Sequence, residues 1–167
     1  GTMTPRFLPY AHQSIVEDDV QAVVQALHAD RITQGPLVEE FEESLARACG
    51  AKYAVAVSSG TAALHLACLA LGVKPSDEVI TSPNTFVASA NCAAFCGGAP
   101  RFVDIDPRTY NLDPQHLEEY RSFGHVRLGG VIPVDFAGHP CDLEGIWKVA
   151  KLRGLIVLAD ACHTPGP

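Results

Sequence analysis

The spacing of hydrophobic residues divides the chain into two parts. Apolar residues recur every three to four positions in residues 15–27 and again in residues 37–48, which predicts two amphipathic helices. Gly35 and Pro36 interrupt the pattern between them, and Gly50 is expected to end the second helix. The side chains expected to face inward from the second helix are Leu37, Phe41 and Leu45.

From Lys52 onward, short continuous apolar runs alternate with helical segments. The predicted strands are residues 53–60, 77–83, 99–106, 129–138 and 155–161. The predicted helices are residues 61–72, 85–98, 113–123 and 141–154. This alternation predicts a mostly parallel sheet covered on both faces, which is a three-layer α/β/α sandwich. We expect residues 1–50 to form an N-terminal helical arm and residues 51–167 to form the sandwich domain.

Composition and charge exclude several classes of protein. The chain has 167 residues, of which 47% are hydrophobic and 19% charged, as in globular soluble domains. Its net charge of −7 argues against general binding of nucleic acid, which requires a basic face. No apolar run approaches the roughly 18 residues that span a membrane, and no secretory signal is recognisable. These features favour a cytoplasmic protein.

Six cysteines lie within apolar patterns. We interpret them as small buried hydrophobic residues in a reducing compartment. No histidine or acidic residue completes a metal site around them, so no metal is expected. The six are Cys49, Cys68, Cys92, Cys96, Cys141 and Cys162.

Polar residues follow the predicted strands, and in parallel sheets ligands bind at these strand ends. Ser59, Gly60 and Thr61 join the first predicted strand to its helix. Gly60 allows the backbone to approach a ligand closely, and the free N–H groups of a helix start favour an anion such as phosphate. Simple capping by the two hydroxyl residues explains the pattern equally well. Neither a Walker A motif nor a G-x-G-x-x-G fingerprint is present.

Three further strand-end residues are candidates for ligand binding. Phe86 can stack on a ring-shaped ligand, or it can pack in the core as most aromatic residues do. Asp160 ends an apolar strand, where a lone carboxylate is costly unless it is paired. A protonated ring nitrogen, as in pyridoxal phosphate, is one suitable partner; a helix cap or a neighbouring arginine are the alternatives. His163 can donate to a ligand oxygen or lie on the surface.

Five motifs then follow one another in order. They are VSSGTAALHLACLALG, DEVITSPNTFVASAN, FVDIDPRTYNLDP, VIPVDFAGHPCDL and LADACH. Together they resemble consecutive motifs of the DegT/DnrJ/EryC1/StrS sugar aminotransferases, which are pyridoxal-phosphate enzymes of the aspartate aminotransferase fold. The resemblance is strongest to the branch of this family that aminates UDP-linked 4-keto-6-deoxy-N-acetylhexosamines. That branch includes the enzyme of pseudaminic acid biosynthesis. The resemblance implies that residues 51–167 are part of the cofactor-binding large domain.

The resemblance also implies a role for each candidate residue. Phe86 would stack on the pyridine ring, Asp160 would pair with the ring nitrogen, and His163 would reach toward the ring hydroxyl. The cofactor phosphate would be held by Ser59, Gly60 and Thr61.

The Schiff-base lysine of the family lies in a motif similar to SFHPxKxxTxGEGG, which the 167 residues lack. A lysine of that kind must be desolvated, whereas the lysines of this chain are expected to be solvated: Lys52, Lys74, Lys148 and Lys151. We therefore expect an N-terminal portion, inactive alone, of an enzyme that moves an amino group from glutamate to a nucleotide-linked keto sugar. As a full-length protein it would form a homodimer. The alternatives are a non-catalytic remnant that binds a phosphate ligand or a partner chain, and a sugar dehydratase of the same fold.

Overall fold

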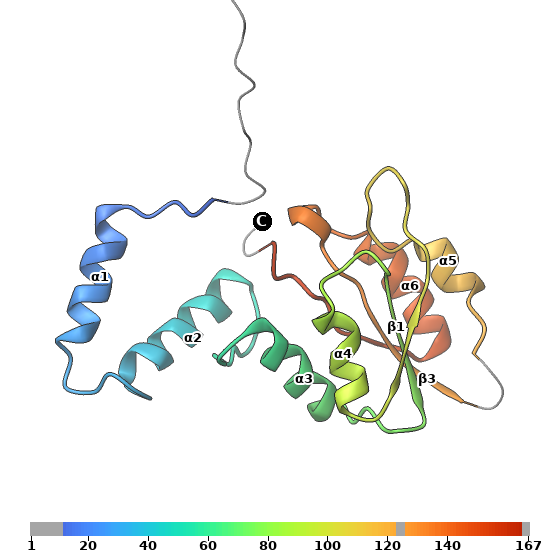
Figure 1. The fold of residues 1–167 in the computed structure, drawn as a ribbon, viewed down its shortest axis with the longest axis horizontal. Helices are drawn as coiled ribbons and strands as arrows, with labels where there is room; N and C mark the ends of the chain where they lie inside the picture. The colour runs from blue at the N-terminus through green and yellow to red at the C-terminus, as the bar shows by residue number, and fades with distance from the viewer. Residues whose placement is uncertain (1–11, 123–125, 165–167) are drawn as a thin grey trace, which may run out of the picture. The chain divides into compact units, whose positions relative to one another are not determined.

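A computed structural model describes residues 12–122 and 126–164 (Figure 1). The chain divides into two compact units, Gly1–Ala56 and Val57–Pro167, which are considered separately below. Within the described ranges, no helix has both the length and the apolar character needed to cross a membrane.

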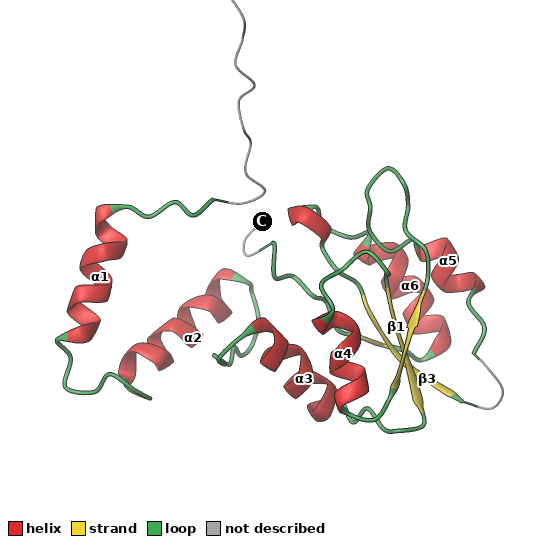
Figure 2. Cartoon of the chain, in the orientation of Figure 1, coloured by secondary structure: helices red, strands yellow, loops and turns green. Residues whose placement is uncertain are grey.

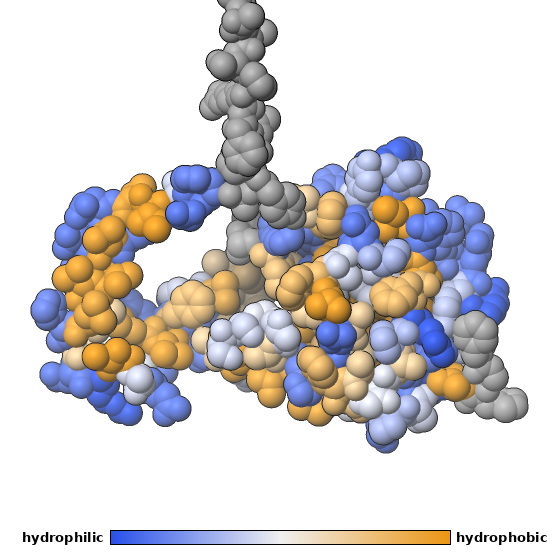
Figure 3. Space-filling model, viewed as in Figure 1, coloured by the Kyte–Doolittle hydropathy of each residue, from blue (hydrophilic) through white to orange (hydrophobic). Residues whose placement is uncertain are grey.

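The first unit contains two helices, as the apolar spacing predicts: α1 (Glu17–Leu27) and α2 (Pro36–Ala48). The Asp19 carboxylate accepts a hydrogen bond of 2.9 Å from the Val16 amide and so satisfies a free N–H at the start of α1. The prediction of an inward face on α2 is wrong for this unit, because the three side chains concerned are exposed. Figure 3 shows hydrophobic side chains at the surface of α1 as well. The exposed side chains of α2 are Leu37, Phe41 and Leu45.

The strand predicted at residues 53–60 is absent from the described chain. Tyr53 and Val55 are 75% and 77% exposed, and the Ala56 amide donates to the Glu42 carboxylate at 2.7 Å instead of to a neighbouring strand. An apolar, β-branched run favours an extended backbone, but a strand also needs a hydrogen-bonded neighbour. The described residues supply none for this segment.

The second unit is built on a four-stranded sheet in the order β2-β1-β3-β4, with every pairing parallel. The other four predicted strands are therefore confirmed, although the last is much shorter than expected. A parallel bridge between Val134 and Asp160 continues the β3–β4 pairing beyond the regular strands. The strands are β1 (Asp77–Thr81), β2 (Ala99–Phe102), β3 (Arg127–Ile132) and β4 (Ile156–Val157).

Helices cover both faces of this sheet, which confirms the three-layer prediction (Figure 2). Val79 and Ile132 pack with side chains of α3 and α4, whereas their neighbours Ile80 and Val131 pack with those of α5 and α6. Successive residues of a strand point to opposite faces, so each apolar strand contributes to two cores. The helices are α3 (Gly60–Ala70), α4 (Ala88–Phe95), α5 (Pro114–Glu119) and α6 (Leu143–Arg153).

Short polar side chains define the ends of these helices. Asp113 accepts from the Gln115 amide at 2.8 Å and starts α5, as its position before Pro114 predicts. Asp142 accepts from the Gly145 amide at 2.9 Å and starts α6.

Two buried acids at the amino end of β1 are neutralised by arginines. Asp77 pairs with Arg127, and this guanidinium holds the pKa of Asp77 below its usual value. Glu78 pairs with Arg101 at 2.8 Å and accepts from the Tyr120 hydroxyl at 3.0 Å. Burial acts to raise the pKa of Glu78, but these hydrogen bonds outweigh it and the pKa lies below its usual value. Buried charges persist when they are paired in this way.

The cysteines differ in burial. Cys68, Cys92 and Cys141 lie in the core as predicted, whereas Cys49 and Cys162 are exposed, so the prediction is wrong for these two. All are free thiols. Burial and the nearby Asp135 raise the pKa of Cys141 to about 12, which keeps that thiol protonated at neutral pH.

The order of the strands determines where a ligand can bind. The chain passes from β1 outward to β2 and then crosses to the other side of β1 to form β3 and β4. The connecting helices therefore lie on opposite faces, with α4 on one and α5 and α6 on the other. A crevice forms at such a reversal, outside the carboxyl ends of the two central strands, which here are β1 and β3.

Candidate cofactor site

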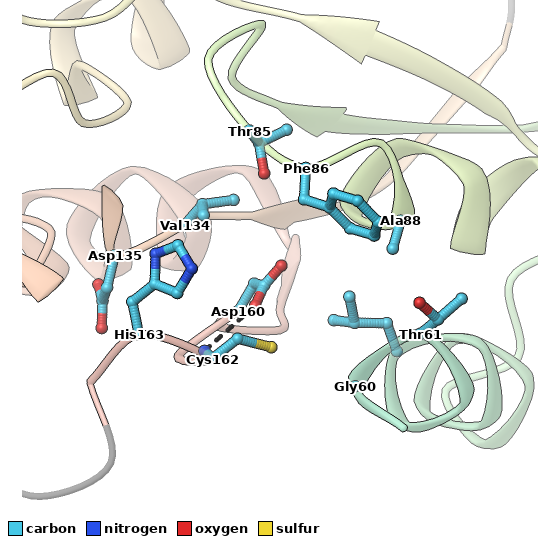
Figure 4. Close-up of a pocket in the computed structure, with 11 residues that line it drawn as sticks. Gly60, Thr61, Thr85, Phe86, Ala88, Val134, Asp135, Asp160, Cys162 and His163 are labelled. Atoms are coloured by element: carbon cyan, nitrogen blue, oxygen red, sulfur yellow. Dashed lines mark hydrogen bonds between the residues drawn. The ribbon is translucent and has the colours of Figure 1, made fainter. Parts of the chain in front are cut away.

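A cavity of about 240 Å³ lies at the carboxyl ends of β1, β3 and β4. The first turn of α3, the loop from β1 into α4, and the segments after β3 and β4 line it. It brings together all of the predicted site residues except Ser59 (Figure 4). Those in the wall are Gly60, Thr61, Phe86, Asp160 and His163.

The start of α3 presents free amides to the cavity. Ser59 is the N-cap, and its hydroxyl accepts from the Ala62 amide at 3.1 Å, so the capping interpretation is correct for this residue. A serine hydroxyl that accepts still has its proton to donate elsewhere. The amides of Gly60 and Thr61 have no acceptor within the described part of the chain. These two N–H groups and the helix dipole can bind an anion.

Gly60 also allows α3 to approach the segment after β4. A Cβ atom at this position would lie 3.0 Å from the Cys162 sulfur, which is closer than side-chain atoms normally pack. Although Cys162 is exposed overall, the hydrogen bond of its thiol to the Asp160 carboxylate, with a smaller effect of partial desolvation, raises the pKa of Cys162 to about 11. Its thiol is therefore protonated at neutral pH and is a poor nucleophile.

Phe86 is a surface residue of the cavity and not a core residue. Its side chain is 72% exposed, and its ring points into the cavity (Figure 4). An aromatic ring held in this way has a free face on which a flat ligand can stack.

Asp160 is a buried carboxylate without a cation among the described residues. It is 7% exposed, and none of the ion pairs among the described residues includes it. Its Oδ2 accepts from the Ser89 hydroxyl at 2.7 Å, and its Oδ1 accepts from the Cys162 amide at 3.3 Å. The alternative of an arginine partner is therefore wrong within the described residues. A buried anion facing a cavity can accept a cationic group of a ligand.

Asp135 is also buried beside the cavity but has a structural task. One of its oxygens accepts from the Cys141 amide at 2.9 Å and the other from the Thr164 hydroxyl at 2.7 Å. Its own amide donates to the Asp160 carbonyl at 3.1 Å. Asp135 thus holds the segment that carries Asp160 and His163. The His163 side chain is exposed and lies beside Asp135 (Figure 4).

Sequence reasoning missed Ser89 and Thr85, whose hydroxyls lie 2.7 Å apart behind Asp160. Ser89 lies in a nearly apolar helix, where a serine gives no sign of its partner. The available signal was its place three residues after Phe86, because residues three apart lie on the same side of the helix predicted at residues 85–98.

The lysines of the second unit, Lys74, Lys148 and Lys151, are exposed, and none of them lines the cavity. Lys52, in the first unit, is exposed as well. In the described ranges, no three histidine, cysteine or acidic residues are grouped to hold a metal ion.

Comparison with known proteins relates this chain to a family of aminotransferases. The model of the DegT/DnrJ/EryC1/StrS aminotransferase family matches residues 13–167. The spore coat polysaccharide biosynthesis protein SpsC of Bacillus subtilis is 46% identical over 94% of this chain and 40% of that protein. GDP-perosamine synthase of Caulobacter vibrioides is 43% identical over 79% of this chain and 35% of that protein.

Solved structures show the same fold. NtdA from Bacillus subtilis, with the cofactor PMP bound, superposes with a TM-score of 0.83 at 35% identity. The superposition covers 91% of this chain and 35% of the NtdA chain. This chain therefore spans well under half the length of the relatives that it matches.

Proposed function

The chain belongs to the DegT/DnrJ/EryC1/StrS aminotransferase family, and from this premise we propose that it forms the cofactor-holding part of a pyridoxal-phosphate-dependent sugar aminotransferase. The observation that carries the proposal is Asp160, a buried carboxylate without a cation that opens onto a cavity. A protonated pyridine nitrogen supplies the missing positive charge.

The rest of the cavity also suits pyridoxal phosphate. The free amides at the start of α3 suit the phosphate, and Ser59 retains a proton to donate to it. The exposed ring of Phe86 suits the flat pyridine, and His163 suits the ring hydroxyl. An anion site, an aromatic wall and a carboxylate in one cavity support a cofactor with a phosphate, a flat ring and a protonated ring nitrogen.

The residues of this chain would bind the cofactor, orient its ring and hold a proton on the ring nitrogen. When bound, pyridoxal phosphate supplies an electron-withdrawing ring that stabilises negative charge on the reacting carbon. Asp160 would keep the proton on the ring nitrogen, because a nearby anion favours the charged form of a base. Phe86 would hold the plane of the ring against its carboxylate partner. No lysine of the second unit lines the cavity, so the cavity residues named here would supply no lysine for the transfer step.

We propose glutamate as the amino donor and a nucleotide-linked 4-keto-6-deoxy sugar as the acceptor. The motif resemblance points to a UDP-linked sugar, and the two curated relatives carry names from polysaccharide and GDP-sugar metabolism. We also propose that the full-length protein acts as a homodimer.

Titration with pyridoxamine 5′-phosphate tests the cofactor site, because this form binds without a lysine. We expect the chain to bind it, and we expect Asp160→Asn to weaken binding by about tenfold or more, as loss of a charged hydrogen bond does. Asp18→Asn in α1 is the matched control, since Asp18 is exposed and lies in the other unit. Failure of the chain to bind, or equal binding by Asp160→Asn, would contradict the proposal.

The second candidate is a non-catalytic module that binds a phosphate-bearing ligand. The absence of Lys74, Lys148 and Lys151 from the cavity wall favours it. Such a module would recognise the phosphate alone. Inorganic phosphate would then compete with pyridoxamine 5′-phosphate on equal terms, and Phe86 and Asp160 would add nothing to affinity.

A further inference from the structure

Ser89 of α4 connects three parts of the cavity wall. Its hydroxyl oxygen lies 2.7 Å from Asp160 Oδ2, 2.7 Å from the Thr85 hydroxyl and 3.1 Å from the Phe86 carbonyl oxygen. The residue is 1% exposed, so water does not compete for these contacts. It therefore joins the loop after β1, a helix and the end of β4.

The number of protons available shows which hydroxyl in this group donates each hydrogen bond. The Ser89 hydroxyl has one proton to donate, while the Asp160 carboxylate and the Phe86 carbonyl only accept. The charged and closer carboxylate is the stronger acceptor. Ser89 therefore donates to Asp160, and the Thr85 hydroxyl donates to Ser89.

Ser89 is consequently the main restraint on the Asp160 side chain. The other contacts of the carboxylate come from Cys162: its amide donates over a longer distance of 3.3 Å, and its thiol, a weak donor, also hydrogen-bonds Asp160. An aspartate side chain turns about two bonds, and the Ser89 hydroxyl opposes both rotations by fixing Oδ2. The amide of the same serine donates to the Phe86 carbonyl at 3.1 Å, which ties the aromatic wall to the acid.

We propose that Ser89 is a positioning residue: its hydroxyl, oriented by Thr85, holds the Asp160 carboxylate in the orientation that meets the pyridine nitrogen of the cofactor. The inference rests on the proposed function for the identity of the ligand. The restraint on Asp160 itself is independent of that function.

The first test is the affinity of the chain for pyridoxamine 5′-phosphate. We expect Ser89→Ala to raise the dissociation constant about five- to tenfold, as loss of a hydrogen bond to a charged group does. Ser89→Thr keeps the hydroxyl and restores most of the affinity. Thr85→Val removes only the donor to Ser89, so about a two- to threefold rise is expected, and this variant answers the question if Ser89→Ala fails to fold.

Ser82→Ala is the matched control. Ser82 is also 1% exposed, and its hydroxyl donates to the Asn84 carbonyl at 3.2 Å and not to Asp160. Ser82→Ala thus removes the same group at similar burial, and we expect it to leave the dissociation constant unchanged.

The second test needs no cofactor. Three-bond NMR couplings from the Asp160 Cγ to its backbone nitrogen and carbonyl carbon report whether the side chain keeps one rotamer. We expect a single rotamer in the parent chain, Ser89→Thr and Ser82→Ala, and averaged couplings in Ser89→Ala.

The two tests separate this inference from the proposed function. If Ser89→Ala binds the cofactor as the parent chain does and keeps a single Asp160 rotamer, Ser89 is not a positioning residue. If the parent chain fails to bind pyridoxamine 5′-phosphate, the proposed function is contradicted. The NMR couplings alone then decide whether Ser89 restrains Asp160. Averaged couplings then support the restraint by Ser89, and unchanged couplings overturn it.

Discussion

At the scale of single residues, the site separates side chains that stabilise the fold from side chains left free for a ligand. Asp77, Glu78 and Asp135 are buried acids whose oxygens are engaged by arginines, amides or hydroxyls. Asp160, like Asp135, is buried without a cation among the described residues, but the hydrogen bond that it accepts from an amide is longer, 3.3 Å against 2.9 Å. Phe86 presents an apolar ring to solvent at the same cavity. Asp160 and Phe86 are therefore the residues whose contacts within the chain leave most room for a ligand.

Phe86→Ala tests this separation. A buried phenylalanine costs about 3–5 kcal/mol when it is truncated, but Phe86 is mostly exposed, so we expect the free energy of unfolding to change by less than about 1 kcal/mol. Affinity for pyridoxamine 5′-phosphate should fall about threefold to tenfold through loss of stacking, and Phe86→Trp should retain it. Denaturant unfolding and ligand titration measure the two quantities.

Phe95→Ala is the control for this variant. Phe95 is exposed at the end of α4, the helix that follows Phe86, and its ring contacts that of His65 edge-on at 5.3 Å. It does not line the cavity. A fall in affinity with Phe95→Ala equal to that with Phe86→Ala would show that the ring of Phe86 has no special role.

At the scale of helices and strands, local polar signals predict element ends well. Aspartates before α5 and α6 cap these helices, and Ser59 caps α3. Such signals work because a cap involves residues only two or three positions apart. The strand predicted at residues 53–60 failed for the opposite reason, since pairing depends on a distant segment.

Ser59→Ala tests the double role of the α3 cap. Loss of the bond to the Ala62 amide should lower the free energy of unfolding by about 1 kcal/mol, and loss of the hydroxyl donor should also weaken phosphate binding. Asp113→Ala removes a comparable cap from α5, so it should lower stability alone. Thermal unfolding and ligand titration of both variants give the comparison; unchanged affinity in Ser59→Ala would assign Ser59 to capping only.

At the scale of the whole molecule, the acids at the amino end of β1 predict how stability depends on pH. The folded-state pKa values of Asp77 and Glu78 lie below their usual values. Each acid therefore stabilises the folded state at pH values above its unfolded pKa of about 4. This contribution is lost as the pH falls through the folded pKa.

We accordingly expect the free energy of unfolding to be nearly constant between about pH 5 and 7 and to fall below about pH 4. The double variant Asp77→Asn/Glu78→Gln should be less stable at pH 7 and should depend less on pH in the acid range. Urea unfolding at a series of pH values measures both. An equal acid dependence in the variant and the parent chain would show that other carboxylates are responsible.

The sequence by itself determined the order of helices and strands in the second unit, the caps of α3 and α5, the layered parallel fold and the family. These features follow from the spacing of apolar residues and from contacts between near neighbours. It also indicated that Asp160 required a partner, because a carboxylate at the end of an apolar strand is costly when unpaired.

Only the tertiary structure decided which partners the residues have. It placed Ser89 against Asp160 from 71 positions away, gave Asp135 a structural task, and left Phe86 exposed at the cavity. It also left residues 53–57 without a strand neighbour. Contacts of this kind depend on how segments that are distant in the sequence meet across the sheet. The local pattern of residues along the chain does not show which distant segments will meet.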